Sequence, residues 1–250
     1  MTEGSSLSCF RRSVYSQNGE DGILQEIFRR LGRVSGWFCE FGAWDGRYGS
    51  NSYNLLLKGW SGVMIEANRV RYRRFEALGH RFAGRLHTLH ATVSYDPSDR
   101  DSLDNLLKRT AIPTEFDLLS IDVDGYDFQI WDATKAYRPV VVVIEINSAI
   151  VPGPEVLHGE GGNGSSFTAM LALDRAKGYV LAAHTGNMIF VRSDLIDLLG
   201  LPPRELENPQ ELFVSDWLAP TRFSVARRKL RFLTRQRLPL ENMLREQLDA

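Results

Sequence analysis

The sequence predicts an α/β protein built on a doubly wound, mostly parallel seven-stranded sheet. Short apolar runs alternate with segments of helical periodicity from residue 21 to residue 177, a pattern typical of a parallel sheet with helices on both faces. The last two apolar runs, 179–184 and 188–192, are separated by only three residues. A link that short makes them an antiparallel hairpin, so the sheet is expected to close in one antiparallel hairpin.

Each element is placed by its periodicity and by the glycines and polar residues around it. Apolar runs predict strands at residues 37–41, 62–66, 86–93, 116–122, 140–147, 179–184 and 188–192. Helical spacing of apolar residues predicts helices at 21–31, 50–58, 70–78, 102–109, 127–137 and 166–177. Gly59 and Gly79 follow two of these helices and are expected to end them as C-caps.

Composition and charge limit the classes of function. A chain of 250 residues, 43% of them hydrophobic, holds one α/β core and a small appendage. The formal net charge of −1 gives no overall attraction to nucleic acid, and no such partner is expected. The N-terminal residues contain no apolar h-region, and no apolar run approaches 18 residues. Neither secretion nor a transmembrane segment is therefore expected. Two cysteines, Cys9 and Cys39, suit a reducing compartment, and a cytoplasmic protein is expected.

The loop after the first strand points to a ligand. Residues 40–46 read EFGAWDG and place two carboxylates, Glu40 and Asp45, around Gly42. A glycine just after a parallel strand lets the backbone approach a ligand closely, and the carboxylates suit a cationic or hydroxyl-rich one. The alternative is a turn that serves only to cap a helix.

A second acidic strand end narrows the ligand to a nucleoside. Glu66 ends the next apolar run, about 20 residues on, where nucleoside-binding folds keep a carboxylate for the ribose. The first loop lacks the G-x-G-x-x-G pattern that holds a pyrophosphate and carries a bulky residue and an acid instead. This disfavours a dinucleotide and favours S-adenosylmethionine, whose aminoacyl and sulfonium groups are cationic.

Oxygen-bearing side chains also gather after the fourth and fifth strands. These strand ends meet at one edge of a parallel sheet, and carboxylate and amide oxygens suit Mg²⁺ or Ca²⁺. The candidate metal ligands are Asp122, Asp124, Glu145 and Asn147. In the alternative reading Asp127 caps the following helix, Glu145 is paired inside the fold and Asp122 hydrogen-bonds the cofactor.

Five ordered segments together carry a resemblance to a known family. They are SQNGEDG (16–22), EFGAWDG (40–46), GWSGVMIE (59–66), SIDVDG (120–125) and IEIN (144–147). Over residues 16–192 the chain resembles the FkbM-like S-adenosylmethionine-dependent methyltransferases, in the bacterial branch with SQNGEDG and EFGAWDG motifs. The resemblance implies a Rossmann-like fold and methyl transfer to a hydroxyl of a sugar-containing or small natural-product acceptor.

The resemblance also implies roles for single residues. Glu40, Gly42 and Asp45 would line the methionine part of the cofactor. Glu66 would bind the ribose, Ala91 and Thr92 the adenine edge, and Asp122 would face the reaction centre. Many family members read Asp-x-Glu-Gly-x-Glu where this chain reads DVDGYD at 122–127. The shorter side chains reach less far, so the acceptor here could differ.

Methyl transfer also needs a group that accepts the proton of the acceptor. Asp122 and His158 are the candidate bases, and His158 lies in a long loop at 151–164 that suits a substrate lid. The alternative is a surface loop with an unengaged histidine. In SQNGEDG, Asp21 is the expected helix N-cap, while Gln17 or Glu20 could fold over the cofactor.

The last 50 residues fall outside the alternating pattern. The predicted organisation is a methyltransferase domain over residues 1–200 and a basic helical extension over 201–250. Between residues 218 and 240 the extension has no acid and carries Arg222, Arg227, Arg228, Lys229, Arg231, Arg235 and Arg237. Such an arm could bind a phosphorylated acceptor, an anionic membrane surface or a second copy of the chain, or dock on the core with its arginines in solvent.

Two other functions remain open from the sequence. One is a metal-dependent enzyme of another class on the same fold, with the four oxygen ligands holding the ion. The other is a non-catalytic partner protein that keeps the fold and uses the basic arm for assembly.

Overall fold

The computed structural model describes residues 4–42, 44–123, 125–157 and 164–218. The chain divides into two units, Met1–Val214 and Ser215–Ala250. The larger unit holds the whole sheet, and the described part of the smaller one is the 3-10 turn η4 (Ser215–Trp217) and Leu218. The predicted boundary at residue 200 stays a prediction, and the basic arm lies outside the described residues. Within the described residues no helix is long and apolar enough to span a membrane.

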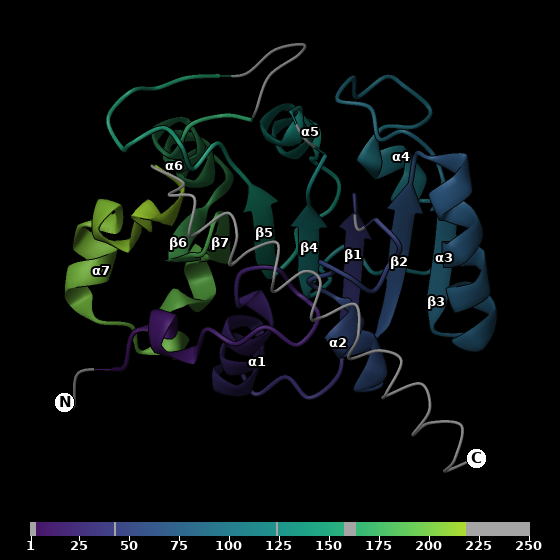
Figure 1. Cartoon of the computed structure of the whole chain (residues 1–250), viewed down its shortest axis with the longest axis horizontal. Helices are drawn as coiled ribbons and strands as arrows, with labels where there is room; N and C mark the ends of the chain where they lie inside the picture. Colours follow the sequence, from purple (N-terminus) through teal and green to yellow (C-terminus); the bar gives the residue numbers. More distant parts are fainter. Residues whose placement is uncertain (1–3, 43, 124, 158–163, 219–250) are drawn as a thin grey trace. The chain divides into compact units, whose positions relative to one another are not determined.

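The sheet has seven strands in the order β3-β2-β1-β4-β5-β7-β6 (Figure 1). The strands are β1 (Trp37–Phe41), β2 (Ser61–Glu66), β3 (Leu86–His90), β4 (Leu118–Ile121), β5 (Val141–Glu145), β6 (Tyr179–His184) and β7 (Asn187–Arg192). The first five strands are parallel to one another, and β7 runs antiparallel to both β5 and β6. The predicted doubly wound, mostly parallel sheet with a closing antiparallel hairpin is confirmed.

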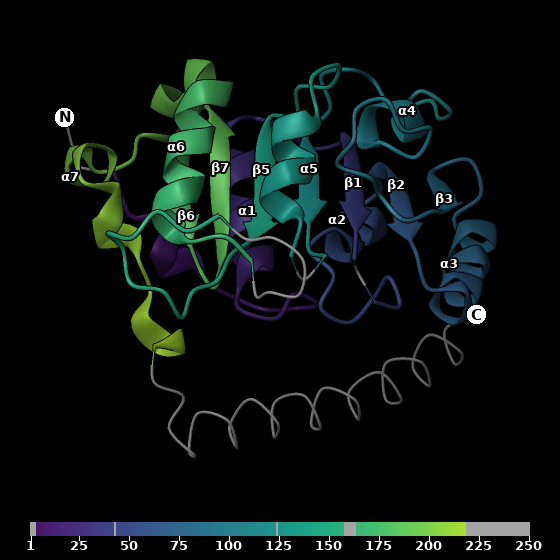
Figure 2. The same cartoon turned by 90° about the horizontal axis from the view of Figure 1, so that it is seen from above.

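Helices cover both faces of this sheet (Figure 2). They are α1 (Glu20–Arg30), α2 (Tyr53–Leu57), α3 (Arg69–Arg81), α4 (Leu103–Leu107), α5 (Asp127–Ala133), α6 (Phe167–Lys177) and α7 (Pro203–Glu207). Short 3-10 helices are η1 (Leu7–Phe10), η2 (Ser193–Leu199) and η3 (Pro209–Leu212). The apolar side chains of α1, α2 and α3 pack in one core cluster, and those of α4, α5 and α6 pack in a second.

The two clusters explain why the central strands carry apolar residues on both faces. Successive side chains of a strand point to opposite faces, so Phe38 belongs to the first cluster and Cys39 to the second. β5 is buried at four consecutive residues from Val141 to Ile144. Burial raises the pKa of the Cys39 thiol, since the thiolate loses its hydration, so Cys39 is an inert core residue, as expected.

Three predicted helix boundaries are wrong. The second helix begins at Tyr53 and not at residue 50, because residues 50–52 bond to Glu40 instead. The third helix runs through Gly79 to Arg81, so Gly79 does not end it. The helix after β4 ends at Ala133, because Thr134 turns to an extended backbone and donates its hydroxyl to Ile130 O.

Candidate cofactor and active site

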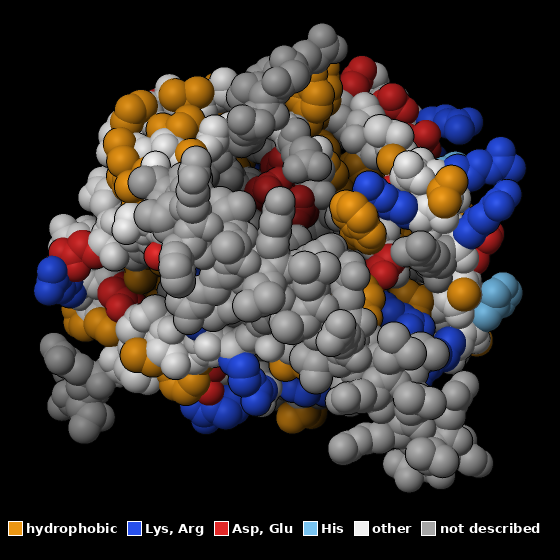
Figure 3. Space-filling view, viewed as in Figure 1, with side chains coloured by type: hydrophobic (Ala, Val, Ile, Leu, Met, Phe, Trp, Pro, Cys, Tyr) orange, Lys and Arg blue, Asp and Glu red, His pale blue; other side chains and the backbone are white. Residues whose placement is uncertain are grey.

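The carboxyl ends of β1, β2, β4 and β5 lie side by side at one edge of the sheet. This is the edge at which open parallel sheets bind ligands. Figure 3 shows acidic side chains gathered in a hollow over the ends of β4 and β5. Glu40, Gly42, Glu66, Asp122 and Glu145 lie in or directly after these strands, and Ala91 and Thr92 lie directly after β3.

Glu40, in β1, holds the loop that precedes α2. Ser50 donates its hydroxyl to Glu40 Oε2 at 2.5 Å, Ser52 donates to the same oxygen, and the Asn51 amide donates to Oε1 at 2.7 Å. Asn51 Nδ2 also donates to Ser120 Oγ of β4 at 3.0 Å. Burial raises the pKa of the Glu40 carboxyl, and the three donors partly offset this. Both Glu40 oxygens therefore accept bonds from protein groups, and the expected contact of Glu40 with a cofactor stays a prediction.

Gly42 follows β1 and lies against the backbone of Asp122 after β4. Its φ of +83° is in the left-handed region, and a Cβ at this position would lie 1.5 Å from Asp122 O. Only glycine, which has no Cβ, can adopt this left-handed φ and also lie this close to Asp122 O. The strand ends of β1 and β4 can therefore approach each other, and the Gly42 backbone stays exposed at the edge.

Asp45 shapes the rest of the same loop. Its Oδ1 accepts hydrogen bonds from the amides of Arg47 at 3.0 Å and Tyr48 at 2.9 Å. This is an Asx-type turn, which orders a loop without any ligand. The predicted contact of Asp45 with the methionine part of a cofactor stays a prediction.

Glu66, at the end of β2, differs from Glu40 in its partners. The side chain is buried, and Oε1 accepts a hydrogen bond from the amide of Asn68 at 2.7 Å. No other group among the described residues donates to this carboxylate. Glu66 O accepts from Ala91 N at 3.3 Å, which brings the half-buried Ala91 and the exposed Thr92 beside this strand end.

Asp127 orders the loop after β4. Its Oδ1 accepts from Val123 N at 2.9 Å and its Oδ2 from Gly125 N at 3.0 Å, and the side chain is buried. Tyr126 is the N-cap of α5 and Asp127 its first residue, so Asp127 orders the loop in front of α5 and does not cap the helix. Asp122, beside Gly42, is half-buried and keeps its candidate role as base.

The predicted metal ligands are only partly described. Asp122 and Glu145 end neighbouring strands, while Asn147 Oδ1 accepts from Ala149 N at 3.1 Å. Asp124 lies outside the described residues. Within the ranges that the structure describes, no three His, Cys, Asp or Glu side chains form a metal-binding group.

The SQNGEDG segment has a structural role that the sequence did not reveal. Gly19 takes the N-cap position of α1 with φ +103°, so the prediction of Asp21 as N-cap is wrong. Asp21 Oδ2 instead accepts from three successive amides, at residues 14–16, at 2.7–2.8 Å. Glu20 Oε1 accepts from Thr185 Oγ1 at 2.7 Å and Asn187 Nδ2 at 3.3 Å, which ties α1 to the β6–β7 turn.

His184, at the end of β6, is a buried structural residue. Its Nδ1 accepts from Val214 N at 2.8 Å, so the neutral ring carries its proton on Nε2, 3.0 Å from Ser148 Oγ. Burial lowers the pKa of His184 to about 4, with a smaller contribution from Arg11. His158, the histidine proposed as a base, lies outside the described residues.

Comparison with known proteins gives a family match over part of the chain. The family model of the methyltransferase FkbM domain matches residues 83–181. No match was found among curated proteins.

Several solved structures show low similarity. An S-adenosylmethionine-dependent methyltransferase from Clostridium acetobutylicum is 8% identical, with a TM-score of 0.44, covering 72% of this chain and 92% of that one. A TehB-like SAM-dependent methyltransferase from Corynebacterium glutamicum is 11% identical, with a TM-score of 0.40 and coverages of 74% and 92%. TrmK of M. capricolum, solved with S-adenosyl-homocysteine, is 10% identical with a TM-score of 0.40, and this chain spans 65% of it.

These similarities are too weak to add to the assignment, which depends on the strand order, the site and the family match. The match begins just before β3 and ends in β6, so it includes the ends of β3, β4 and β5. The predicted resemblance to the FkbM methyltransferases is thereby confirmed over residues 83–181, which match the family model of the methyltransferase FkbM domain.

Proposed function

We propose that this chain transfers the methyl group of S-adenosylmethionine to a hydroxyl group of a sugar-containing or small natural-product acceptor. The observation that carries the proposal is the position of the buried Glu66 carboxylate beside the exposed Gly42 backbone. They lie at the ends of adjacent parallel strands. The FkbM match over residues 83–181 supports methyl transfer as the reaction class.

The side chains at this edge suit the cofactor. Ribose hydroxyls donate hydrogen bonds, and Glu66 has an oxygen to which no described residue donates. Gly42 leaves the end of β1 without a side chain, so a methionine group can lie close to the backbone. Ala91, whose amide donates to Glu66 O, and Thr92 would contact the adenine edge. Glu40 would contribute through the loop that it holds.

The chain's part in the reaction is to align the acceptor and remove its proton. When bound, S-adenosylmethionine supplies an electrophilic methyl group on a sulfonium. Alignment contributes up to roughly 7–11 kcal/mol and a general base roughly 10²–10⁴-fold. Asp122, which follows β4 beside Gly42, is the proposed base that takes the proton from the acceptor hydroxyl oxygen. His158 is the second candidate for this role.

A product assay tests the proposal. Purified protein is incubated with S-adenosylmethionine and a panel of sugar and natural-product alcohols, and S-adenosylhomocysteine and methylated product are measured by mass spectrometry. Product at a hydroxyl oxygen supports the proposal. Nucleoside binding without S-adenosylhomocysteine formation, together with loss of another activity on addition of a chelator, would favour the metal-dependent alternative.

The variant Asp122→Asn tests the proposed base. Turnover is expected to fall about 10²–10⁴-fold, while S-adenosylhomocysteine affinity changes far less. Asp132→Asn is the matched control, since Asp132 is an exposed acid on α5 that pairs only with Lys135 among the described ion pairs. Equal losses of turnover and affinity in Asp122→Asn would make Asp122 a cofactor ligand and not a base.

A further inference from the structure

Trp44 has an unusual backbone for a large residue. It is the one non-glycine residue in the described part of the chain with a left-handed backbone, at φ +53°. Such a conformation is strained for a bulky residue, and strained residues cluster where ligands are held. The indole is 54% exposed. A large aromatic ring is thus held at the surface of the loop that follows β1.

The loop is anchored by groups other than the Trp44 side chain. Asp45 Oδ1 accepts from two amides inside the loop. Gly49 donates its amide to Tyr15 O at 2.9 Å. A Cβ on Gly46 would come within 3.3 Å of side chains of α3 and β2, so the loop backbone also packs closely there. Anchoring of the loop therefore does not explain why Trp44 has a strained backbone conformation.

The partner of the indole is Arg71, in the first turn of α3. The guanidinium carbon lies 4.1 Å from the centroid of the Trp44 ring. Arg71 is positioned by Asn68, whose Oδ1 accepts the Arg71 amide and whose own amide donates to Glu66. The stack therefore joins the loop after β1 to the helix after β2. The two strands that precede these segments are paired, with Phe41 opposite Ile65, the residue before Glu66.

We propose that Trp44 and Arg71 form a latch that closes over a nucleoside bound at Glu66 and slows its release. The inference rests on the proposed function, because it takes that nucleoside to be S-adenosylmethionine or its product. A cation–π contact is weak in water and stronger when water is excluded. A ligand bound beneath the pair would shield it from water, so the stack stabilises the complex more than the free protein.

Release of S-adenosylhomocysteine, measured by stopped-flow displacement, tests the latch. Trp44→Ala and Arg71→Ala are each expected to release the ligand about tenfold faster than wild type, as expected for one desolvated cation–π contact. The double variant is expected to be no faster than either single one, because both substitutions remove the same contact. If Trp44 and Arg71 only stabilised the fold, the substitutions would change the melting temperature, and the release rates of the single and double variants would not show this non-additivity.

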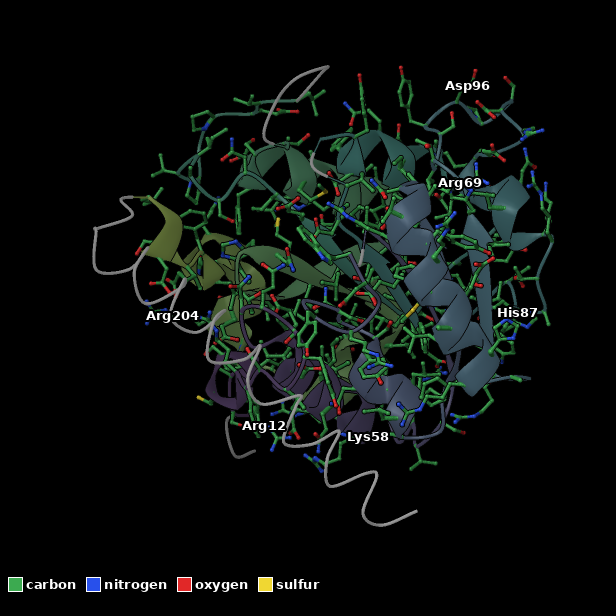
Figure 4. All side chains as sticks on the ribbon, turned by 45° about the vertical axis from the view of Figure 1, so that its right-hand side comes forward. Arg12, Lys58, Arg69, His87, Asp96 and Arg204 are labelled. Carbon is green, nitrogen blue, oxygen red and sulfur yellow. The ribbon has the colours of Figure 1, made fainter. Side chains whose placement is uncertain are left out.

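Two further variants keep the test decisive. Arg69→Ala removes the same charge from the start of α3, where Arg69 is exposed (Figure 4), and should leave the release rate unchanged. Trp44→Gly removes the indole and relieves the strained φ. It should release the ligand as fast as Trp44→Ala while folding at least as stably as wild type. If Trp44→Ala is unstable, Trp44→Gly therefore replaces it in the release experiment.

The outcomes separate the latch from the proposed function. If wild type does not bind S-adenosylhomocysteine, the proposed function fails and the latch fails with it. If wild type binds and both single variants release the ligand at the wild-type rate, only the latch is overturned. Additive effects in the double variant, or an equal effect of Arg69→Ala, would also overturn it.

Discussion

Glu40 and Glu66 occupy similar places in the sequence but differ in what surrounds them. Each lies at the carboxyl end of an apolar strand, and the strands are adjacent and parallel. The Glu40 carboxylate accepts three hydrogen bonds from residues 50–52, whereas Glu66 accepts one, from Asn68 N, among the described residues. An acid at a strand end is therefore either part of the scaffold or open to a ligand, and the donors of the following loop decide which.

The largest expected effect is on the stability of Glu40→Ala. The substitution leaves the Ser50 and Ser52 hydroxyls and the Asn51 amide without their acceptor in a buried site. The free energy of unfolding should fall by ~3–5 kcal/mol, measured by urea denaturation. A fall below about 1 kcal/mol would contradict the scaffold role of Glu40 and favour its predicted role as a cofactor ligand.

Gly42→Ala should affect both folding and binding, because Gly42 connects the scaffold to the site. A Cβ would overlap Asp122 O, and alanine is disfavoured at φ +83°. A loss of ~2–4 kcal/mol in stability is expected, together with weaker S-adenosylhomocysteine binding in the fraction that folds. Gly32→Ala is a matched control, since Gly32 has a positive φ of +67° but no atom within 4 Å of its would-be Cβ. Equal losses in the two variants would show that backbone strain alone, and not the close approach to Asp122, is responsible.

Ser52→Ala removes one of the three donors to Glu40. A smaller loss of about 1 kcal/mol in unfolding free energy is expected, with cofactor affinity nearly unchanged. A large loss of affinity at wild-type stability would mean that this loop contacts the ligand directly.

The dependence of stability on pH gives the smallest and most specific signal. Because the folded-state pKa of Glu40 is raised, its stabilising contribution is full below pH 4.5 and is lost as the pH rises through the folded-state pKa. The unfolding free energy of wild type minus that of Glu40→Gln should therefore fall as pH rises. His184 also makes unfolding free energy depend on pH, because its stabilising contribution is lost as pH falls from 6.5 through about 4. This contribution is the same in both proteins, so it cancels when the free energy of Glu40→Gln is subtracted from that of wild type. A difference that rises with pH would contradict the burial of Glu40.

The sequence predicted the sheet well because periodicity and link length act locally. The three-residue link between the apolar runs at 179–184 and 188–192 allows only an antiparallel hairpin, and the apolar run at 140–147 is long enough only for a buried strand. The sequence also predicted that the acidic strand ends meet at one edge of the sheet, since parallel strands bring these ends together. The sequence did not predict the tertiary hydrogen-bond partners of these acids. No local pattern shows that residues 50–52 donate to Glu40, or that Asp21 accepts hydrogen bonds from the amides of residues 14–16 instead of capping α1.

The contact of Arg71 with Trp44 was missed for the same reason. The two residues are 27 positions apart by their numbers in the sequence, and they meet only because α3 returns beside the loop after β1. The left-handed backbone of Trp44 has no sequence signal either, since such conformations are expected at glycine. The contact and the backbone conformation both depend on the tertiary fold, so the sequence alone predicts neither.

The central claim is that Glu66 binds the ribose of S-adenosylmethionine while Glu40 holds the scaffold. The most direct test is calorimetric titration of wild type and Glu66→Ala with S-adenosylhomocysteine. We predict binding to wild type and a loss of ~1.5–3 kcal/mol in Glu66→Ala, with less than about 1 kcal/mol lost in unfolding free energy. Equal affinity of the two proteins would contradict the account, and no binding to wild type would remove the methyltransferase proposal altogether.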